Sequence, residues 1–343
     1  MKPNQGSSQG RDMSRLAVAA RSAVEDATWA PSVHNTQPWL FSRRGDRITL
    51  RADADRRLEV ADPAGREMLI SCGAALFTLR VAVRRQGYEP EVVLLPDPDR
   101  PNLLADVRLR SGGLPAWPEN ERVYDQIRRR RTHRGGFKPG EVPESLLGAL
   151  RREAQREGAS LYLVEDSNAQ AALAALTVAA EHMHRLIPAY RGELGRWAPA
   201  PGSRRREGVH ETAYPRETAR TEPDFAGRDF GRGRGWGIDA SILEWLEEPA
   251  VGVACVLATK DDNPADWLRT GQALQRLLLR ATSEGDVAAA FHTQALEVPE
   301  LRELVRVHFC AGDHPQMLMR LGTGGTAFTS VRRPVEEVFT EKD

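Results

Sequence analysis

The chain has 343 residues, 41% of them hydrophobic, which is enough for one large domain or two ordinary ones. Its 48 basic and 48 acidic residues cancel, so a general nucleic-acid or anionic-membrane binder, which needs excess positive charge, is disfavoured. The three cysteines have no metal or redox spacing and predict buried thiols in a reducing compartment. We find no membrane-length apolar run and no signal peptide, and we expect a cytoplasmic protein.

Helices and strands alternate in the first part of the chain. After a disordered tail over residues 1–13, apolar periodicity predicts a helix from Ser14 to Trp29, capped by Ser14. A strong helix over 64–87 ends at Gly87. Strands over 47–53, 90–96 and 104–110, and a helix over 119–129, complete this part.

The second part resumes the same alternation, with one interruption. We predict helices over 143–158, Asn168–Tyr190, Pro264–Glu284 and 299–308, and strands over 159–165, 250–259 and 315–322. The long stretch from Gly192 to Gly237 has no hydrophobic period, so it is either disordered or a functional lid.

A repeat links the two strongest helices. Gly73 and Gly87 flank the first, Gly271 and Gly285 flank the second, and both pairs are offset by 198 residues. Each helix follows a strand and a proline-containing turn. We interpret the chain as two copies of one α/β unit, joined covalently and packed as the subunits of a homodimer pack.

The segment RRTHR, residues 130–134, follows a predicted helix. In an extended backbone Arg130, Thr132 and Arg134 would point the same way, and two guanidiniums with a hydroxyl suit a phosphate dianion. The segment alone favours the plainer alternative, a solvated basic helix end that complements the helix dipole.

The stretch APSVHNTQPW, residues 30–39, suits no regular element. It resembles the flavin-contacting turn of the FMN-dependent nitroreductase family, and its sequence is especially similar to that of the Acg-type branch. RRTHR resembles the family's phosphate-binding motif, and residues 315–338 resemble its C-terminal signature. The resemblance implies an α/β (α+β) fold of two tandem nitroreductase-like repeats, each a mainly antiparallel sheet flanked by helices. The halves would span 14–115 and 116–340, with a lid insertion over 192–237.

The resemblance also implies roles for single residues at the flavin ring. Pro31 and Ser32 would lie against the isoalloxazine ring, while Asn35 and Gln37 would fix the turn or its polar edge. His34 in the same turn is either a general acid or, as we expect, a turn histidine bonded to the backbone.

Two further groups follow from the resemblance. The FMN phosphate would be held by Arg130, Thr132 and Arg134, with Arg332, and alternatively Arg333, as a second cationic arm from the tail. Glu284-Gly285 would match an acidic-glycine pair whose glycine lets a backbone N–H approach flavin N5. No metal site and no catalytic side chain are assigned.

The two halves would divide the work. The counterpart of RRTHR in the first half would be RDMSR, which lacks the pattern, and Gln86-Gly87 replaces Glu284-Gly285. We therefore expect one complete FMN site per chain and a monomer that is itself a pseudo-dimer.

Two functions agree with this resemblance. The first is an oxidoreductase that takes hydride from NAD(P)H and passes electrons through FMN to an unknown small electrophile. The second is a protein that binds and sequesters FMN without turnover, beneath a closed lid with Arg196, Trp197 and Phe230 as candidate contacts. A nucleic-acid-binding module fails on net charge.

Overall fold

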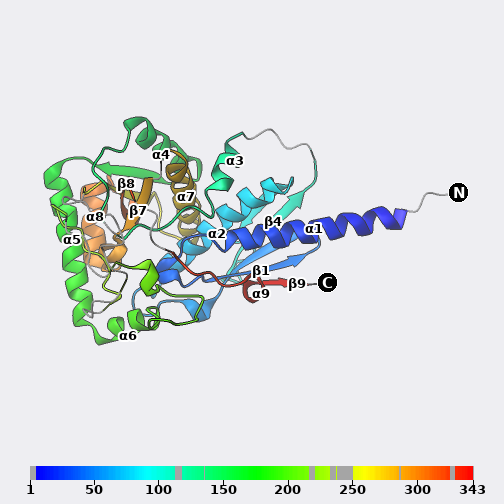
Figure 1. The fold of residues 1–343 in the computed structure, drawn as a ribbon, viewed down its shortest axis with the longest axis horizontal. Helices are drawn as coiled ribbons and strands as arrows, with labels where there is room; N and C mark the ends of the chain where they lie inside the picture. Colours follow the sequence, from blue (N-terminus) through cyan, green and yellow to red (C-terminus); the bar gives the residue numbers. More distant parts are fainter. Residues whose placement is uncertain are drawn as a thin grey trace.

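Two sheets flanked by helices lie side by side, one built mainly by the first half of the chain and one by the second (Figure 1). The computed structural model describes residues 5–112, 118–134, 136–215, 221–231, 237, 250–285, 287–324 and 329–342. The predicted α+β class with two mainly antiparallel sheets is confirmed. No described helix combines the length and apolarity needed to cross a bilayer.

The first sheet has five strands in the order β3-β4-β2-β1-β9. Its central strands alternate buried and exposed side chains, so one face packs on the helices while the other carries polar groups. The first half supplies α1 (Gln5–Ala27), β1 (Trp39–Arg44), β2 (Arg47–Ala52), α2 (Arg66–Arg85), β3 (Glu89–Leu94) and β4 (Leu103–Arg110). Helix α3 (Pro118–Asp125) follows the boundary that we predicted between the two halves.

The second sheet has four antiparallel strands in the order β5-β6-β8-β7. Both faces are covered, and its middle strands β6 and β8 are apolar and buried almost throughout. The second half supplies α4 (Glu144–Arg156), β5 (Ser160–Val164), α5 (Ser167–Leu186), α6 (Pro188–Arg196), β6 (Val253–Thr259), α7 (Pro264–Ser283), β7 (Val287–Phe291), the 3₁₀ turn η5 (Thr293–Leu296), α8 (Pro299–Phe309) and β8 (His314–Thr323).

The helices α2 and α7 cross at the centre of the molecule, and the repeat glycines lie at the crossing. A Cβ on Gly73 would lie 2.3 Å from the carbonyl oxygen of Leu268, and a Cβ on Gly271 would lie 2.0 Å from that of Ile70. Leu268 is Ile70 displaced by the same 198 residues, so the contact is reciprocal, as at a two-fold axis. The repeat predicted from glycine spacing is thus a pseudo-two-fold packing of the two halves.

The C-terminus crosses from the second half to the first. After the short helix α9 (Val335–Val338), strand β9 (Phe339–Glu341) pairs in parallel with β1 at the edge of the first sheet. Residues 339–341 therefore add to the first sheet, although the predicted second half included residues 339 and 340.

Three other expectations need correction. Helix α1 begins at Gln5, so the tail expected over residues 1–13 is helical from that residue on and Ser14 is not a cap. The helix predicted over Asn168–Tyr190 ends at Leu186, because Pro188 cannot donate a backbone hydrogen bond and begins α6 instead.

Candidate active site

A cavity lies between the two halves and encloses about 1100 Å³, counting the part open to solvent. The first half contributes the 31–34 turn and the N-terminal part of α2, and the second half contributes residues 132–134, the end of β7 and part of β8. Residues between 214 and 230 close it from a third side. Neither half could form this cavity alone.

The turn that follows α1 has a strained backbone. His34, Asn35 and Gln37 have φ values of 46°, 54° and 51°, a region that residues other than glycine seldom adopt. The Ser32 hydroxyl stabilises the turn by accepting a hydrogen bond of 3.0 Å from the Gln37 backbone N–H. Pro31, Ser32, Val33 and His34 line the cavity.

Asn35 and Gln37 do not line the cavity. Their side chains tie the turn to two distant segments: the Asn35 amide donates to the Gly208 carbonyl at 3.0 Å, and the Gln37 amide donates to the Arg206 carbonyl at 2.8 Å. The Gln37 side-chain oxygen also accepts the Arg333 backbone N–H at 2.7 Å. Of the two roles implied for these residues, the geometry favours holding the turn.

Three arginines converge beside the cavity from the two motifs at opposite ends of the second half. Arg134 lines the cavity, whereas Arg130, only 3% exposed, and Arg332 lie behind its wall and both donate to the Trp29 carbonyl at 3.3 Å. Thr132 lines the cavity next to Arg134. The alternative of a solvated basic helix end is wrong for Arg130, which is buried.

Nothing negative in the described part of the chain balances these three cations. None of the ion pairs among the described residues includes Arg130, Arg134 or Arg332, and the Nε and Nη1 atoms of Arg130 and the Nε of Arg332 are buried without a hydrogen-bond partner. Burial, and then the neighbouring arginines, lower the pKa of Arg130 and of Arg332 to about 9. Burial likewise lowers the pKa of Arg134 to about 10. Buried cations without a counter-charge are costly, so this arrangement calls for an anion.

Glu284 and Gly285 lie elsewhere. The Glu284 carboxylate pairs with Arg280 on the surface at 2.8 Å, and neither residue lines the cavity. The opposite end of β7 reaches it instead, through His292 and Thr293. We therefore do not carry forward the flavin N5 role for Glu284-Gly285. No sequence signal marked Thr293, because a lone threonine after an alanine-rich strand has no motif.

His34 lines the cavity and is 6% exposed, yet neither ring nitrogen has a hydrogen-bond partner among the described residues. The expected backbone hydrogen bond is therefore wrong. Burial, and then the charges of Arg228 and Arg134, hold its pKa well below the usual range, so the ring is neutral. A neutral imidazole offers one donor and one acceptor to a bound molecule, but it is no acid at neutral pH.

A covering segment, residues 197–231 in its described parts, forms the third wall. Phe230 packs edge-on against His34 at 5.3 Å, and Arg228 forms an ion pair with Glu297 and donates to the Thr293 hydroxyl at 2.8 Å. Residues 192–196 belong to α6 rather than to this segment. Of the three predicted contacts only Phe230 lines the cavity; the Arg196 side chain is 68% exposed.

Comparisons with known proteins agree with this architecture. The chain is 32% identical over 315 residues to Rv3131 of Mycobacterium tuberculosis, covering 89% of this chain and 85% of that protein. It is 30% identical over 329 residues to Acg of the same organism, covering 93% and 94%. Both relatives carry the provisional name NAD(P)H nitroreductase. The chain belongs to the nitroreductase family, in the branch that contains Acg.

Two further comparisons add little. No protein-family model matches the chain. The match to an FMN-bound nitroreductase from Bacteroides fragilis covers 62% of this chain and 93% of that one, at 13% identity. The match to the nitroreductase NfnB from Mycobacterium smegmatis, solved with NADPH, covers 63% of this chain and 96% of that one, at 18% identity. Their TM-scores of 0.32 and 0.35 are too low to compare single positions.

Proposed function

We propose that this chain is an FMN-dependent oxidoreductase that passes electrons from NAD(P)H to a small electrophile. The observation that carries the proposal is the group of three arginines without a counter-charge beside a cavity that both halves build. A phosphate dianion would supply the missing negative charge and would bond the orphaned guanidinium nitrogens. The provisional names of the relatives Rv3131 and Acg support the same activity.

The residues present fit FMN in three respects. Arg130, Arg134 and Arg332 would hold its phosphate, with Thr132 as a hydroxyl donor. Pro31 and Ser32 would flank its ring, on a turn whose backbone is already fixed by hydrogen bonds. FMN supplies the hydride chemistry, and the protein supplies binding, orientation and charge. Because one chain carries both halves of the site, we also propose that it acts as a monomer.

The test is an anaerobic titration of the purified, FMN-loaded protein with NADPH, followed by absorbance near the flavin band. We expect stoichiometric bleaching, and recovery when an acceptor such as a quinone is added. FMN that stays oxidised while bound would overturn the oxidoreductase and leave only flavin binding.

A second function, FMN sequestration without turnover, is favoured by the covering segment. Phe230 and Arg228 close the cavity over the turn, and Arg228 is fixed by its ion pair with Glu297. In this alternative the bound FMN would stay oxidised during the NADPH titration, and it would exchange only slowly with free FMN.

Replacing Phe230 by alanine should speed FMN release about tenfold or more. Truncating a buried phenylalanine costs about 3–5 kcal/mol. If roughly a third of that cost shifts the equilibrium from the covered to the open cavity, the release rate rises about tenfold. The measurement is the rate of FMN release in the presence of excess competing apoprotein. The control is Arg196→Ala on the exposed surface of α6, which should not change the rate. Equal rates for both variants would show that the segment does not gate the cavity.

A further inference from the structure

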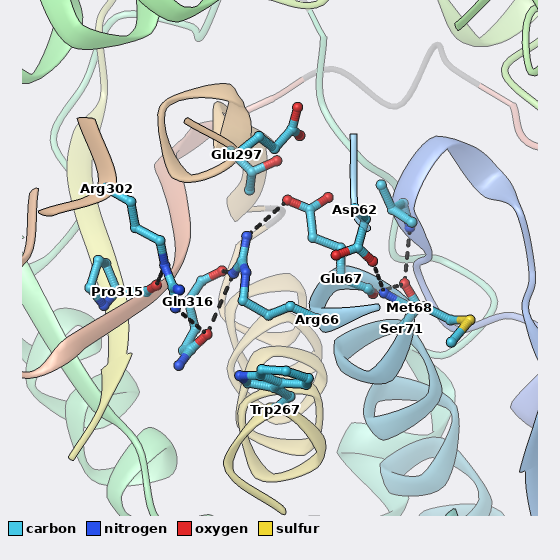
Figure 2. A network of polar contacts seen from close by, with 12 residues as sticks. Asp62, Arg66, Glu67, Met68, Ser71, Trp267, Glu297, Arg302, Pro315 and Gln316 are labelled. Atoms are coloured by element: carbon cyan, nitrogen blue, oxygen red, sulfur yellow. Dashed lines mark hydrogen bonds and ion pairs between the residues drawn. The ribbon is translucent and has the colours of Figure 1, made fainter. Parts of the chain in front are cut away.

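A second charged cluster, separate from the three arginines, reaches the cavity through Glu67 and Arg228. It consists of Asp62, Arg66 and Glu67 at the start of α2, Glu297 after η5, and Arg228 of the covering segment. Figure 2 shows Asp62, Arg66, Glu67 and Glu297 as they approach from the two halves of the chain. The oxidoreductase proposed above assigns no role to this cluster.

Each charged group has a defined partner except one. The Arg66 guanidinium donates to Glu67 at 3.1 Å and to the Gln316 carbonyl at 2.5 Å, and Arg228 pairs with Glu297 (Figure 2 for the Arg66 contacts). Among the described residues Asp62 has no cation in contact; its carboxylate accepts the Met68 backbone N–H at 2.8 Å. All three carboxyls are buried, with Asp62 5% and Glu67 4% exposed and the Glu297 side chain 2% exposed.

The neighbouring groups do not change this balance. Arg302 is paired with Asp262 at 2.8 Å, and Tyr190 donates to Glu297 as a neutral phenol. His184 lies 3.7 Å from Glu297, but burial and then Arg228 lower its pKa to about 4, so it is uncharged. Two more carboxylates flank the cluster, and each has an arginine of its own: Glu181 with Arg185 and Glu193 with Arg196.

Three buried carboxyls therefore face two guanidiniums. Fully ionised, the cluster would hold one buried negative charge without a partner, which is costly, so it retains one proton near neutral pH. Burial, and then the carboxylates nearby, raise the pKa of Asp62 and of Glu67 to about 7. The charge count and the pKa shifts agree.

Among the described residues that line the cavity, Glu67 is the only carboxylate. The histidines His34 and His292 are neutral, because burial and nearby arginines lower both pKa values, that of His292 to about 3. Burial raises the pKa of Tyr214, so its phenol does not ionise near neutrality. Glu67 is therefore the described carboxyl placed to exchange a proton with a molecule in the cavity, which His133 also lines.

We propose that Glu67 is the proton donor to the electron acceptor, and that the neighbouring carboxyls of Asp62 and Glu297 keep it protonated between turnovers. The proposal rests on the proposed function and adds one requirement: reduction of the acceptor takes up a proton, as reduction of a quinone does. A quinone takes up a hydride that originates from NAD(P)H, which supplies two electrons and one hydrogen. The Glu67 O–H bond breaks, its proton forms the second O–H bond of the hydroquinone, and the carboxylate left behind is paired with Arg66 until a solvent proton restores it.

The first test uses flavin-free protein and needs no turnover. A carboxyl whose pKa is higher in the folded state stabilises the fold below its unfolded pKa, and that contribution is lost as pH rises through the folded pKa. Between pH 5 and 8 the retained proton alone should lower the folding equilibrium constant roughly 50-fold. We expect this loss to disappear in Glu67→Gln and in Asp62→Asn, because either change leaves two carboxyls for two guanidiniums. Parallel pH curves for wild type and both variants would overturn the proton reservoir.

The second test compares two acceptors in FMN-loaded protein. Ferricyanide takes electrons only, whereas a benzoquinone also needs a proton. Glu67→Gln should slow quinone reduction about 100-fold more than ferricyanide reduction, within the usual range for a lost general acid. Equal losses with both acceptors would make Glu67 a packing residue and overturn the proposal.

Asp62→Asn separates the reservoir from the donor, because Asp62 does not line the cavity. Without the Asp62 carboxyl, Glu67 ionises at lower pH. The rate of quinone reduction should therefore begin to fall at a lower pH than in the wild type, and it should recover when the pH is lowered. An unshifted profile would overturn the reservoir. Protein that binds no FMN, or is not reduced by NADPH, would instead contradict the proposed function, and the unfolding experiment would still decide whether the cluster holds a proton.

Discussion

Arg130→Met should give folded protein that has lost most of its affinity for FMN. A charge-assisted hydrogen bond contributes about 1.5–3 kcal/mol, so FMN binding should weaken roughly 10- to 150-fold. The same change removes a buried guanidinium that has no counter-charge and whose Nε and Nη1 atoms have no hydrogen-bond partner among the described residues. Flavin-free protein should therefore unfold at the same or a higher denaturant concentration. The measurements are FMN titration by flavin fluorescence and urea unfolding of the apoprotein.

The control is the next residue in the chain. Arg131 donates to the carbonyls of Arg128 and Arg130 and does not line the cavity. Arg131→Met should therefore change FMN affinity by less than about threefold, a few tenths of a kcal/mol. If Arg130→Met keeps wild-type affinity, or if both variants lose it equally, the phosphate does not lie at this group of arginines.

Gly271→Ala should lose several kcal/mol of folding stability. The new Cβ would lie 2.0 Å from the Ile70 carbonyl oxygen and 2.7 Å from both the Ala74 nitrogen and the Gly73 Cα. All of these are backbone atoms of α2, so relief requires the two central helices to separate, and overpacking of this kind costs about 1–3 kcal/mol or more. Urea unfolding measures the loss, and the cavity between the halves should widen with it.

Gly148→Ala is the matched control, because that glycine is also helical but its Cβ would meet only the Arg152 side chain, at 3.6 Å. Alanine is favoured over glycine inside a helix by about 1 kcal/mol, so this variant should be equally or more stable. A Gly271→Ala protein as stable as Gly148→Ala would show that α2 and α7 do not meet where the repeat places them.

Much of the fold could be predicted from the sequence because the central helices are long and strongly periodic. The glycine offset predicted a repeat of these two helices, and the structure adds that Gly73 and Gly271 meet at their crossing, where only glycine permits such close approach. Strand β7 was missed because its alanines carry little strand signal, and β1 because it is short and partly polar. The crossing of β9 to the first sheet is a long-range pairing that local pattern cannot reveal.

The site was predictable where a motif carried it. Residues 31–34 of the turn and residues 132–134 of RRTHR line the same cavity, as the two motifs suggested. Glu67, Thr293 and Arg228 were missed because they come from three separate segments without a motif, and only the fold brings them together. Glu284-Gly285 was misplaced because it lies at the wrong end of β7.

The most direct measurement is the number of FMN molecules bound per chain after reconstitution with excess flavin, by flavin absorbance against protein concentration. Because the arginines come from the second half and the proline-serine turn from the first, the account predicts one. Two FMN per chain would show that each half builds a site of its own, and none would show that the arginines do not receive a flavin phosphate.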